Sequence, residues 1–202
     1  MLELDQNRDE LFVSLRHCGT DESRWPPAFD EAKRLCQAVY ASLYPDYALA
    51  PTEAYDASAC LLYSRGAGGD VTGMLRVCFD SPAGLPIGAS LGREIDTLRS
   101  CGVSVGEPGR FVIPDGRVLY KAYLRAIYQI AVHCELDVYL MQVRSEHADF
   151  YRRNCAASDI GGEDVTPGCT NLAWNIERTP PRFFRAFGAD QNHLRTFLDG
   201  QG

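Results

Sequence analysis

The sequence predicts one mixed α/β domain in which helices alternate with strands. Two short apolar stretches, at 57–64 and 71–79, flank a glycine-rich turn at 65–70, a pattern typical of a β-hairpin. A third apolar stretch, at 107–113, runs through a Pro-Asp-Gly turn into a segment with helical apolar spacing at 117–134. The length of 202 residues suits one domain with a sizeable core.

The other elements of the first half follow from the same rules. Residues 1–27 are acidic and end in Trp-Pro-Pro, which indicates an arm or a short helix before a break. Apolar residues at helical spacing over 29–43 predict an amphipathic helix, which Pro45 ends. Residues 80–105 are rich in Pro, Gly and Ser and predict a long loop with room for a short helix.

The second half continues the alternation. The spacing predicts a strand at 137–143 and a short helix at 145–154, with Ser145 as its N-cap. Two further strands are expected at 157–165 and 170–177.

Three regions are expected along the chain. Residues 1–27 form an N-terminal arm, residues 28–180 form the domain, and residues 181–202 form a tail whose spacing from 182 to 198 is helical. No internal repeat is visible.

Composition excludes several classes of protein. Apolar residues make up 46% and charged residues 23%, values that exclude a disordered chain and a collagen. No apolar run reaches the ~18 residues of a membrane span. The acidic N-terminus lacks the features of a secretory signal, so we expect a cytoplasmic protein. The net charge of −7 argues against nucleic acid as a partner.

This charge is unevenly distributed. Residues 1–70 hold 6 basic and 12 acidic residues, a net of −6, whereas residues 71–202 hold 14 and 15, a net of −1. A locally basic segment at 110–125 has four basic residues against Asp115. It could be a solvated helix face or a docking surface for an acidic partner.

The cysteines and histidines show no metal-binding pattern. All eight cysteines stand singly, without a C-x-x-C pair, and none of the four histidines lies near another at ligand spacing. We therefore expect reduced thiols, no metal site and no covalent cysteine intermediate.

The strand–turn–helix unit ending in the helix at 117–134 could bind a phosphate. The first N–H groups of a helix lack intrahelical partners and carry partial positive charge. Arg117, at the start of this helix, could add a forked donor pair. A purely structural unit is the other interpretation.

The segment 107–113 (EPGRFVI), followed by the helix at Arg117, resembles the E-x-x-R-[FL]-x-[VI] strand of acyl-homoserine-lactone synthases and N-acyl amino acid synthases. These families belong to the GNAT-like acyltransferase superfamily. Four more motifs agree in order: Arg34 with Val39-Tyr40, Tyr55-Asp56, Gly73-Met74-Leu75-Arg76-Val77, and Phe150-Tyr151-Arg152-Arg153. The resemblance spans about residues 30–177 and implies a GNAT-like acyl-CoA N-acyltransferase fold, a mixed central sheet flanked by helices.

The resemblance implies an enzyme that moves a fatty acyl group to the amine of an amino acid or similar small molecule, forming an amide. The donor would be an acyl thioester of acyl carrier protein or of CoA, and no tightly bound cofactor is implied. The helix start lacks the Q/R-x-x-G-x-G/A pattern of CoA-dependent GNAT enzymes, which favours a carrier protein. The tryptophan that often follows the first helix of lactone synthases is absent, which favours an amino acid over S-adenosylmethionine. A conventional acetyl-CoA acetyltransferase and a non-catalytic GNAT-like binding protein are the alternatives.

Glu107 is the candidate general base, because the attacking amine must lose a proton. It could instead form a structural ion pair with Arg110 or Arg76. Arg110 is expected to orient a carboxylate, and Arg76 to do the same or to bind the carboxylate of the acceptor. Asp56 could bind an amine or cap a turn.

The other site candidates lie on either side of the Pro-Asp-Gly turn. Backbone N–H groups of the strand could stabilise the oxyanion, at Phe111, Val112 and Ile113. The cations of the helix could bind the carrier or its phosphopantetheine, at Arg117, Lys121 and Arg125, with Arg152 and Arg153 as further basic candidates.

Overall fold

The computed structural model describes residues 10–15, 27–44, 54–114, 117–162 and 166–187. Seven strands form one sheet in the order β1-β2-β3-β4-β5-β7-β6. In chain order the strands are β1 (Glu10–Leu15), β2 (Ala59–Arg65), β3 (Val71–Phe79), β4 (Val105–Val112), β5 (Val138–Arg144), β6 (Ser158–Asp159) and β7 (Cys169–Asn175). Neighbours pair antiparallel except β4 and β5, which pair parallel.

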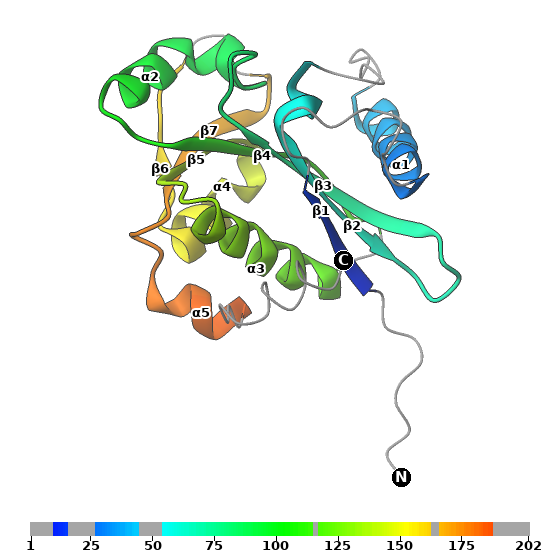
Figure 1. Ribbon diagram of the computed structural model, residues 1–202. Helices are drawn as coiled ribbons and strands as arrows, with labels where there is room; N and C mark the ends of the chain where they lie inside the picture. The colour runs from blue at the N-terminus through cyan, green and yellow to red at the C-terminus, as the bar shows by residue number, and fades with distance from the viewer. Residues whose placement is uncertain (1–9, 16–26, 45–53, 115–116, 163–165, 188–202) are drawn as a thin grey trace.

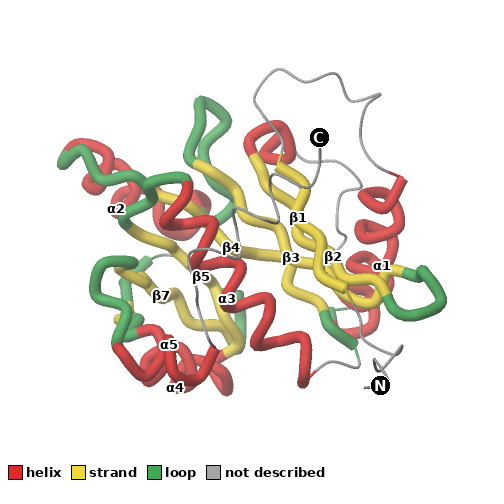
Figure 2. The backbone as a smooth tube through the Cα atoms, turned by 60° about the horizontal axis from the view of Figure 1, so that its bottom comes forward, coloured by secondary structure: helices red, strands yellow, loops and turns green. Residues whose placement is uncertain are grey.

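Helices cover both faces of the sheet (Figure 1). The helices are α1 (Pro27–Leu43), the 3₁₀ helix η2 (Ala54–Ser58), α2 (Gly88–Ser100), α3 (Arg117–His133), α4 (Ser145–Cys155) and α5 (Pro181–Phe187). Helices α1 and α2 pack on one face, here called the α1/α2 face. Helices α3, α4 and α5 pack on the other, the α3/α4 face (Figure 2). The predicted mixed α/β sheet flanked by helices is confirmed.

The hydrophobic core has one large cluster and two smaller ones. The large cluster fills the α3/α4 face, where the apolar stripe of α3 meets the sheet at residues such as Leu62, Leu75 and Leu172. On the opposite face one cluster lies under α1 and a separate cluster lies under α2. The strip of sheet between these two clusters is where the polar side chains described below are found.

Residues 10–15 form an edge strand, which corrects the expectation of an arm or a short helix at this position. They pair with β2 from Glu10 opposite Arg65 to Leu15 opposite Cys60. The Leu-Phe-Val run within this segment has high β propensity, which the surrounding acidic residues obscured in the sequence.

The long segment 80–105 contains the 13-residue helix α2. Glycines and prolines obscured the helical spacing of its apolar residues. Two of these, Leu91 and Ile95, face the sheet and are buried. The helix is kinked at Leu91, whose φ of −126° and ψ of 26° are not helical. It is therefore a short first turn followed by a longer second segment.

Strands β4 and β5 have two features that matter for the site. Their parallel pairing holds only two residue pairs, Val105 with Val138 and Gly106 with Tyr139. Beyond these pairs the remaining residues of β4 receive no ladder hydrogen bonds from β5. Second, the register between β3 and β4 shifts at Arg110, a β-bulge where this non-glycine residue has a φ of 55°.

Smaller differences from the sequence predictions concern the last third of the chain. Ser145 is not the N-cap of α4, since Arg144 holds that position and the Ser145 hydroxyl lies 2.9 Å from that of Thr170. Strand β6 is only two residues long. Helix α5 ends at Phe187, and the rest of the predicted helical tail lies outside the described residues.

Candidate active site

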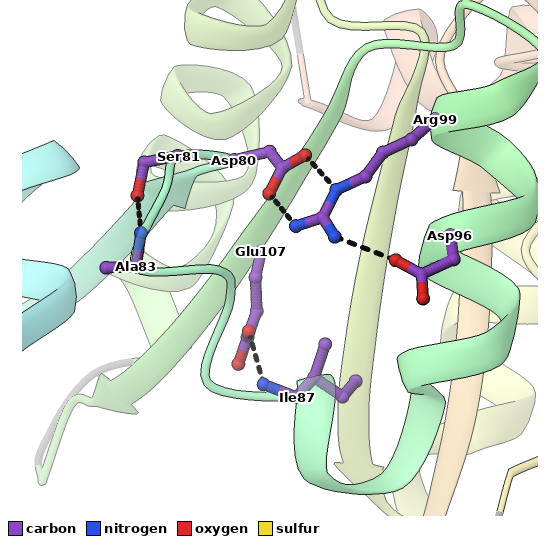
Figure 3. Close-up of polar contacts among 7 residues, drawn as sticks. All are labelled: Asp80, Ser81, Ala83, Ile87, Asp96, Arg99 and Glu107. Carbon is purple, nitrogen blue, oxygen red and sulfur yellow. Dashed lines mark hydrogen bonds and ion pairs between the residues drawn. The ribbon is translucent and has the colours of Figure 1, made fainter.

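Glu107 lies on β4 and faces α2. It stands opposite Cys78 in the register, and that residue belongs to the apolar cluster under α2. Its Oε2 accepts a hydrogen bond of 2.7 Å from the backbone N–H of Ile87, the N-cap residue of α2 (Figure 3). The half-buried carboxylate therefore sits at the positive end of the α2 dipole.

Ion pairs of Arg99 fix the C-terminal end of α2. Arg99 forms a two-bond fork with Asp80, which follows β3, with distances of 2.7 and 2.6 Å, and it also binds Asp96 (Figure 3). The Arg99 guanidinium lowers the pKa of the Asp80 carboxyl. Helix α2 thus contacts β4 through Glu107 at one end and β3 through Asp80 at the other.

Asp56 is the centre of a buried ion cluster. Its Oδ1 accepts a hydrogen bond of 2.8 Å from Arg76 on β3, and its Oδ2 accepts one of 2.8 Å from Lys33 on α1. Asp56 is 2% exposed and Arg76 is 7% exposed. The Asp56 carboxylate thus holds one cation on each of its two oxygens.

Arg110 reaches the same face of the sheet because of the bulge. Its guanidinium lies 5.4 Å from the centroid of the Tyr40 ring on α1. Burial raises the pKa of the Tyr40 hydroxyl to about 12, and the neighbouring Arg110 opposes that rise. The guanidinium is therefore held in place by an aromatic face and a hydroxyl.

The register brings these charges together. Arg76 stands opposite Gly109, and a Cβ added at Gly109 would lie 3.6 Å from Oε1 of Glu107. The Glu107 carboxylate therefore leans along β4 towards the position opposite Arg76. Four of the predicted site residues, Asp56, Arg76, Glu107 and Arg110, thus share the α1/α2 face.

The three residues after Arg110 point to alternate faces. Val112 is buried in the cluster under α1, whereas Phe111 and Ile113 pack on the α3/α4 face. The Phe111 ring contacts Tyr120 and Tyr123 of α3, with centroid distances of 5.4 and 5.3 Å. Their backbone, by contrast, runs along the side of β4 where β5 has separated.

The predicted carrier-binding cations lie on α3, across the sheet from Glu107. Arg117 is the first residue of α3, and its side chain lies outside the described part of the chain. Lys121 is exposed and Arg125, one turn later, is half-buried. Arg152 is already engaged, since it forks onto Asp159 and also binds Asp149, which weakens its candidacy as a docking residue.

Two parts of the site were missed in the sequence. Lys33 gave no signal, because a single lysine on an amphipathic helix is usually solvated. Gln142 on β5 donates a hydrogen bond of 3.2 Å to buried Asn171 and accepts one of 2.6 Å from Thr166. Extending the β4–β5 register places Gln142 level with Gly109, across the separation between the strands.

No group of three or more histidine, cysteine or acidic side chains in the described ranges is arranged to hold a metal ion. Nor does any helix of the described chain have the length and apolarity needed to cross a membrane.

A sequence profile described as N-acyl amino acid synthase FeeM matches residues 31–174, well over half of the chain. The chain belongs to the FeeM family of N-acyl amino acid synthases. The resemblance read from five short motifs is therefore confirmed. Membership makes the chain an acyltransferase rather than a non-catalytic binding protein. No protein with curated annotation matches the chain significantly in sequence.

Solved structures show the GNAT-like fold. The structure of FeeM, an N-acyl amino acid synthase from uncultured soil microbes, matches with a TM-score of 0.68 at 17% identity, over 85% of this chain and 93% of that chain. BjaI, a CoA-dependent acyl-homoserine lactone synthase with SAM and isopentyl-CoA, matches with a TM-score of 0.62 at 10% identity, over 90% of each chain. TofI, in a complex with an inhibitor and MTA, has a TM-score of 0.57 at 18% identity, over 91% and 98%.

Proposed function

We propose that this FeeM-family acyltransferase moves a fatty acyl group from the thioester of acyl carrier protein to the amine of an amino acid. The observation that carries the proposal is the carboxylate of Glu107 on the same face of the sheet as the cations Arg76 and Arg110, beside the point where β4 and β5 separate. A carboxylate can take the proton of an amine, and the cations can bind the carboxylate of the same acceptor. This pairing matches the two charged groups of an amino acid.

In the proposed reaction the acceptor approaches from the α1/α2 face. Glu107 takes a proton from the ammonium group, directly or through a water molecule, because only the neutral amine is nucleophilic. Arg110 binds the acceptor carboxylate in a forked geometry. Asp56 contributes indirectly, by holding Lys33 and Arg76 in position.

The thioester lies along β4 in the separation from β5. The amine nitrogen attacks its carbonyl carbon, a C–N bond forms, and negative charge develops on the carbonyl oxygen. We assign the donation to that oxygen to backbone N–H groups between Phe111 and Ile113. The C–S bond then breaks and the pantetheine thiolate leaves, taking up the second proton that the nitrogen loses, to give the amide and a free thiol.

Two features favour a carrier protein over CoA and an amino acid over S-adenosylmethionine. The start of α3 lacks the glycine pattern of CoA-dependent GNAT enzymes, and α3 carries Lys121 and Arg125, which suit an acidic protein. The tryptophan expected after α1 in lactone synthases is absent. The cytoplasmic location and the three-part division of the chain stay predictions.

The decisive experiment is mass spectrometry of lipids from cells overexpressing the wild type or Glu107→Gln. The wild type should produce a new N-acyl amino acid. Glu107→Gln keeps an oxygen that can accept from Ile87, so the fold should persist while the rate falls by about 10²–10⁴-fold. Undiminished product from Glu107→Gln would reduce Glu107 to a structural role. Purified enzyme given one acyl chain on carrier protein and on CoA would then identify the donor.

A further inference from the structure

Helix α2 begins with a short turn that presents an N–H group to Glu107. The backbone N–H of Ile87 donates to Glu107 Oε2 at 2.7 Å (Figure 3). The kink at Leu91 separates this first turn from the longer segment that follows it. A kink interrupts the regular hydrogen-bond ladder of a helix, so the position of the first turn depends also on the groups packed beside it.

The segment 160–162, which follows β6 and is called the strap below, packs beside that turn. Ile160 packs against the apolar cluster under α2. A Cβ added at Gly162 would lie 2.5 Å from the carbonyl oxygen of Ser90 and 2.6 Å from Cδ2 of Leu91, at the kink. The strap backbone therefore lies against the kink and leaves no space there for a side chain.

The two glycines of the strap differ in what they require. Gly162 has a φ of 134°, a conformation that residues with a side chain rarely adopt. Gly161 has no positive φ, and its added Cβ would make only ordinary contact, 3.9 Å from Oε1 of Glu94. The close approach to α2 thus depends on Gly162 and not on its neighbour.

Asn171 on β7 holds the strap from the other side. It is 3% exposed, and its backbone carbonyl oxygen accepts a hydrogen bond of 3.2 Å from the N–H of Ile160. Its Nδ2 donates a long hydrogen bond of 3.5 Å to the carbonyl oxygen of Gly161, and its Oδ1 accepts one of 3.2 Å from Gln142 on β5. A Cβ at Gly162 would also lie 2.8 Å from this Nδ2. The strap therefore lies between a buried amide anchored to the sheet and the kink of α2.

Ser90 connects the strap to the N–H that binds Glu107. Its carbonyl oxygen is the one closest to Gly162, and its buried hydroxyl donates to the carbonyl oxygen of Ile87 at 3.1 Å. The backbone N–H groups of Ser90 and Leu91 donate to the same carbonyl oxygen, at 2.9 and 3.0 Å. A displacement of Ser90 would therefore also displace Ile87.

We propose that Gly162 and Asn171 are positioning residues for Glu107, because they fix the first turn of α2 and so keep the N–H of Ile87 on the Glu107 carboxylate. With Oε2 held in this way, Oε1 is directed along β4 towards Gly109. The inference rests on the proposed function, since it takes Glu107 as the general base. A base must stay within hydrogen-bond reach of its proton, and a displacement of about 1 Å can lower a rate about 100-fold.

The test compares Gly162→Ala with Gly161→Ala, neighbouring substitutions that add the same methyl group. Hydrogen exchange measured by NMR gives the protection of the Ile87 amide relative to the amides of β5, and acyl-transfer kinetics give kcat and the KM for the acyl donor. Gly162→Ala should lower the relative protection of Ile87 about tenfold or more, as expected for a lost hydrogen bond to a charged group. It should lower kcat about tenfold or more and leave KM unchanged. Gly161→Ala, the matched control, should change neither quantity.

Asn171→Ala is the second variant, because it removes the anchor of the strap without adding bulk, and it decides the question if Gly162→Ala does not fold. It should lower Ile87 protection and kcat in the same direction. Unchanged protection or unchanged kcat in a folded variant of either residue would overturn the inference, as would equal losses in Gly161→Ala and Gly162→Ala. Lowered Ile87 protection in a family of proteins that all lack acyl transfer, wild type included, would overturn the proposed function and leave the coupling of Gly162 to Ile87 intact.

Discussion

The two faces of β3 and β4 carry opposite chemistry. On the α1/α2 face they present Arg76, Glu107 and Arg110, and on the α3/α4 face they present Leu75 and Phe111. Strand side chains alternate between faces, so one strand pair can supply charge for an acceptor and apolar surface for an acyl chain. In the proposed reaction, a charged acceptor on one face can then reach an apolar acyl group on the other face at the edge of β4.

The bulge at Arg110 produces this separation of charged and apolar side chains. Glu107 and Gly109 face α1/α2, and strict alternation would send Arg110 to the opposite face and return Phe111 to this one. The extra residue reverses the alternation, so that Arg110 reaches Tyr40 while Phe111 reaches Tyr120. One left-handed residue thus places a cation and a ring on opposite faces of the sheet.

The largest expected effect comes from disrupting the ion cluster around Asp56 on the α1/α2 face. Asp56→Ala leaves the buried Arg76 and its neighbour Lys33 without their shared carboxylate, so the free energy of unfolding should fall by about 3–5 kcal/mol. Chemical denaturation measures the change. The control Asp96→Ala removes an exposed i,i+3 partner of Arg99 and should cost at most about 0.5 kcal/mol. Equal losses in the two variants would mean that the cluster is not buried in solution.

The next largest effect comes from disrupting the packing around Gly73 on the α3/α4 face. A Cβ at Gly73 would lie 2.9 Å from Ser64 Oγ and 3.1 Å from both the Tyr123 hydroxyl and the Val112 carbonyl oxygen. Gly73→Ala should therefore cost about 1–3 kcal/mol of unfolding free energy.

Gly92→Ala provides the matched control for that substitution, since nothing lies within 4 Å of its added Cβ. It should stabilise α2 by about 0.5–1 kcal/mol, because alanine loses less backbone entropy on folding. Thermal melts of both variants should move in opposite directions. A shift in the same direction would contradict the packing described for Gly73.

A third prediction concerns the outer surface of α3. Reversing both charges in Lys121→Glu/Arg125→Glu should weaken docking of acyl carrier protein by about tenfold and flatten its salt dependence. The matched control is Arg93→Glu on α2, across the sheet, which should leave docking unchanged. Unchanged kinetics with an acyl carrier substrate in the double variant would contradict a carrier dock on α3.

The last effect is a pH dependence of stability that arises on the α1/α2 face and is confined to alkaline solution. Burial raises the pKa of Tyr40 from 10.0 to about 12, so the folded state favours the neutral hydroxyl. This contribution to stability is complete below pH 10 and is lost as the pH rises towards 12. Wild type should therefore lose stability relative to Tyr40→Phe over that interval in alkaline denaturation. Parallel curves for the two proteins would contradict it.

How much the sequence could predict depends on whether a feature is local. Helix α3 and the β2–β3 hairpin follow from periodicity within a few residues, and both were predicted. The Asp56–Arg76 pair joins positions 20 residues apart, and its geometry depends on the register of β3. Ser145 shows the same limit, because its hydroxyl contacts Thr170 on β7 instead of capping its own helix.

The same distinction applies to the candidate site. Glu107 and Arg110 could be named because a short strand motif holds them both. Lys33 could not be named, since nothing around it reveals that Asp56 approaches it in the fold. The hydrogen bond from Ile87 to Glu107 was equally hidden, because it requires a helix that glycines and prolines obscured.

The two-pair contact between β4 and β5 determines which interactions join the two halves of the sheet. It divides the sheet into two antiparallel leaves, β1–β4 and β5–β7–β6, joined by a very short backbone seam. The large core cluster spans both leaves, with Leu75 on one side and Leu172 on the other, and α3 lies between them. Side-chain contacts with α3 therefore join the leaves, together with the hydrogen bonds between Ser104 and Asp137 beside the two ladder pairs. The backbone continuity of the sheet therefore depends on few ladder hydrogen bonds at this one seam.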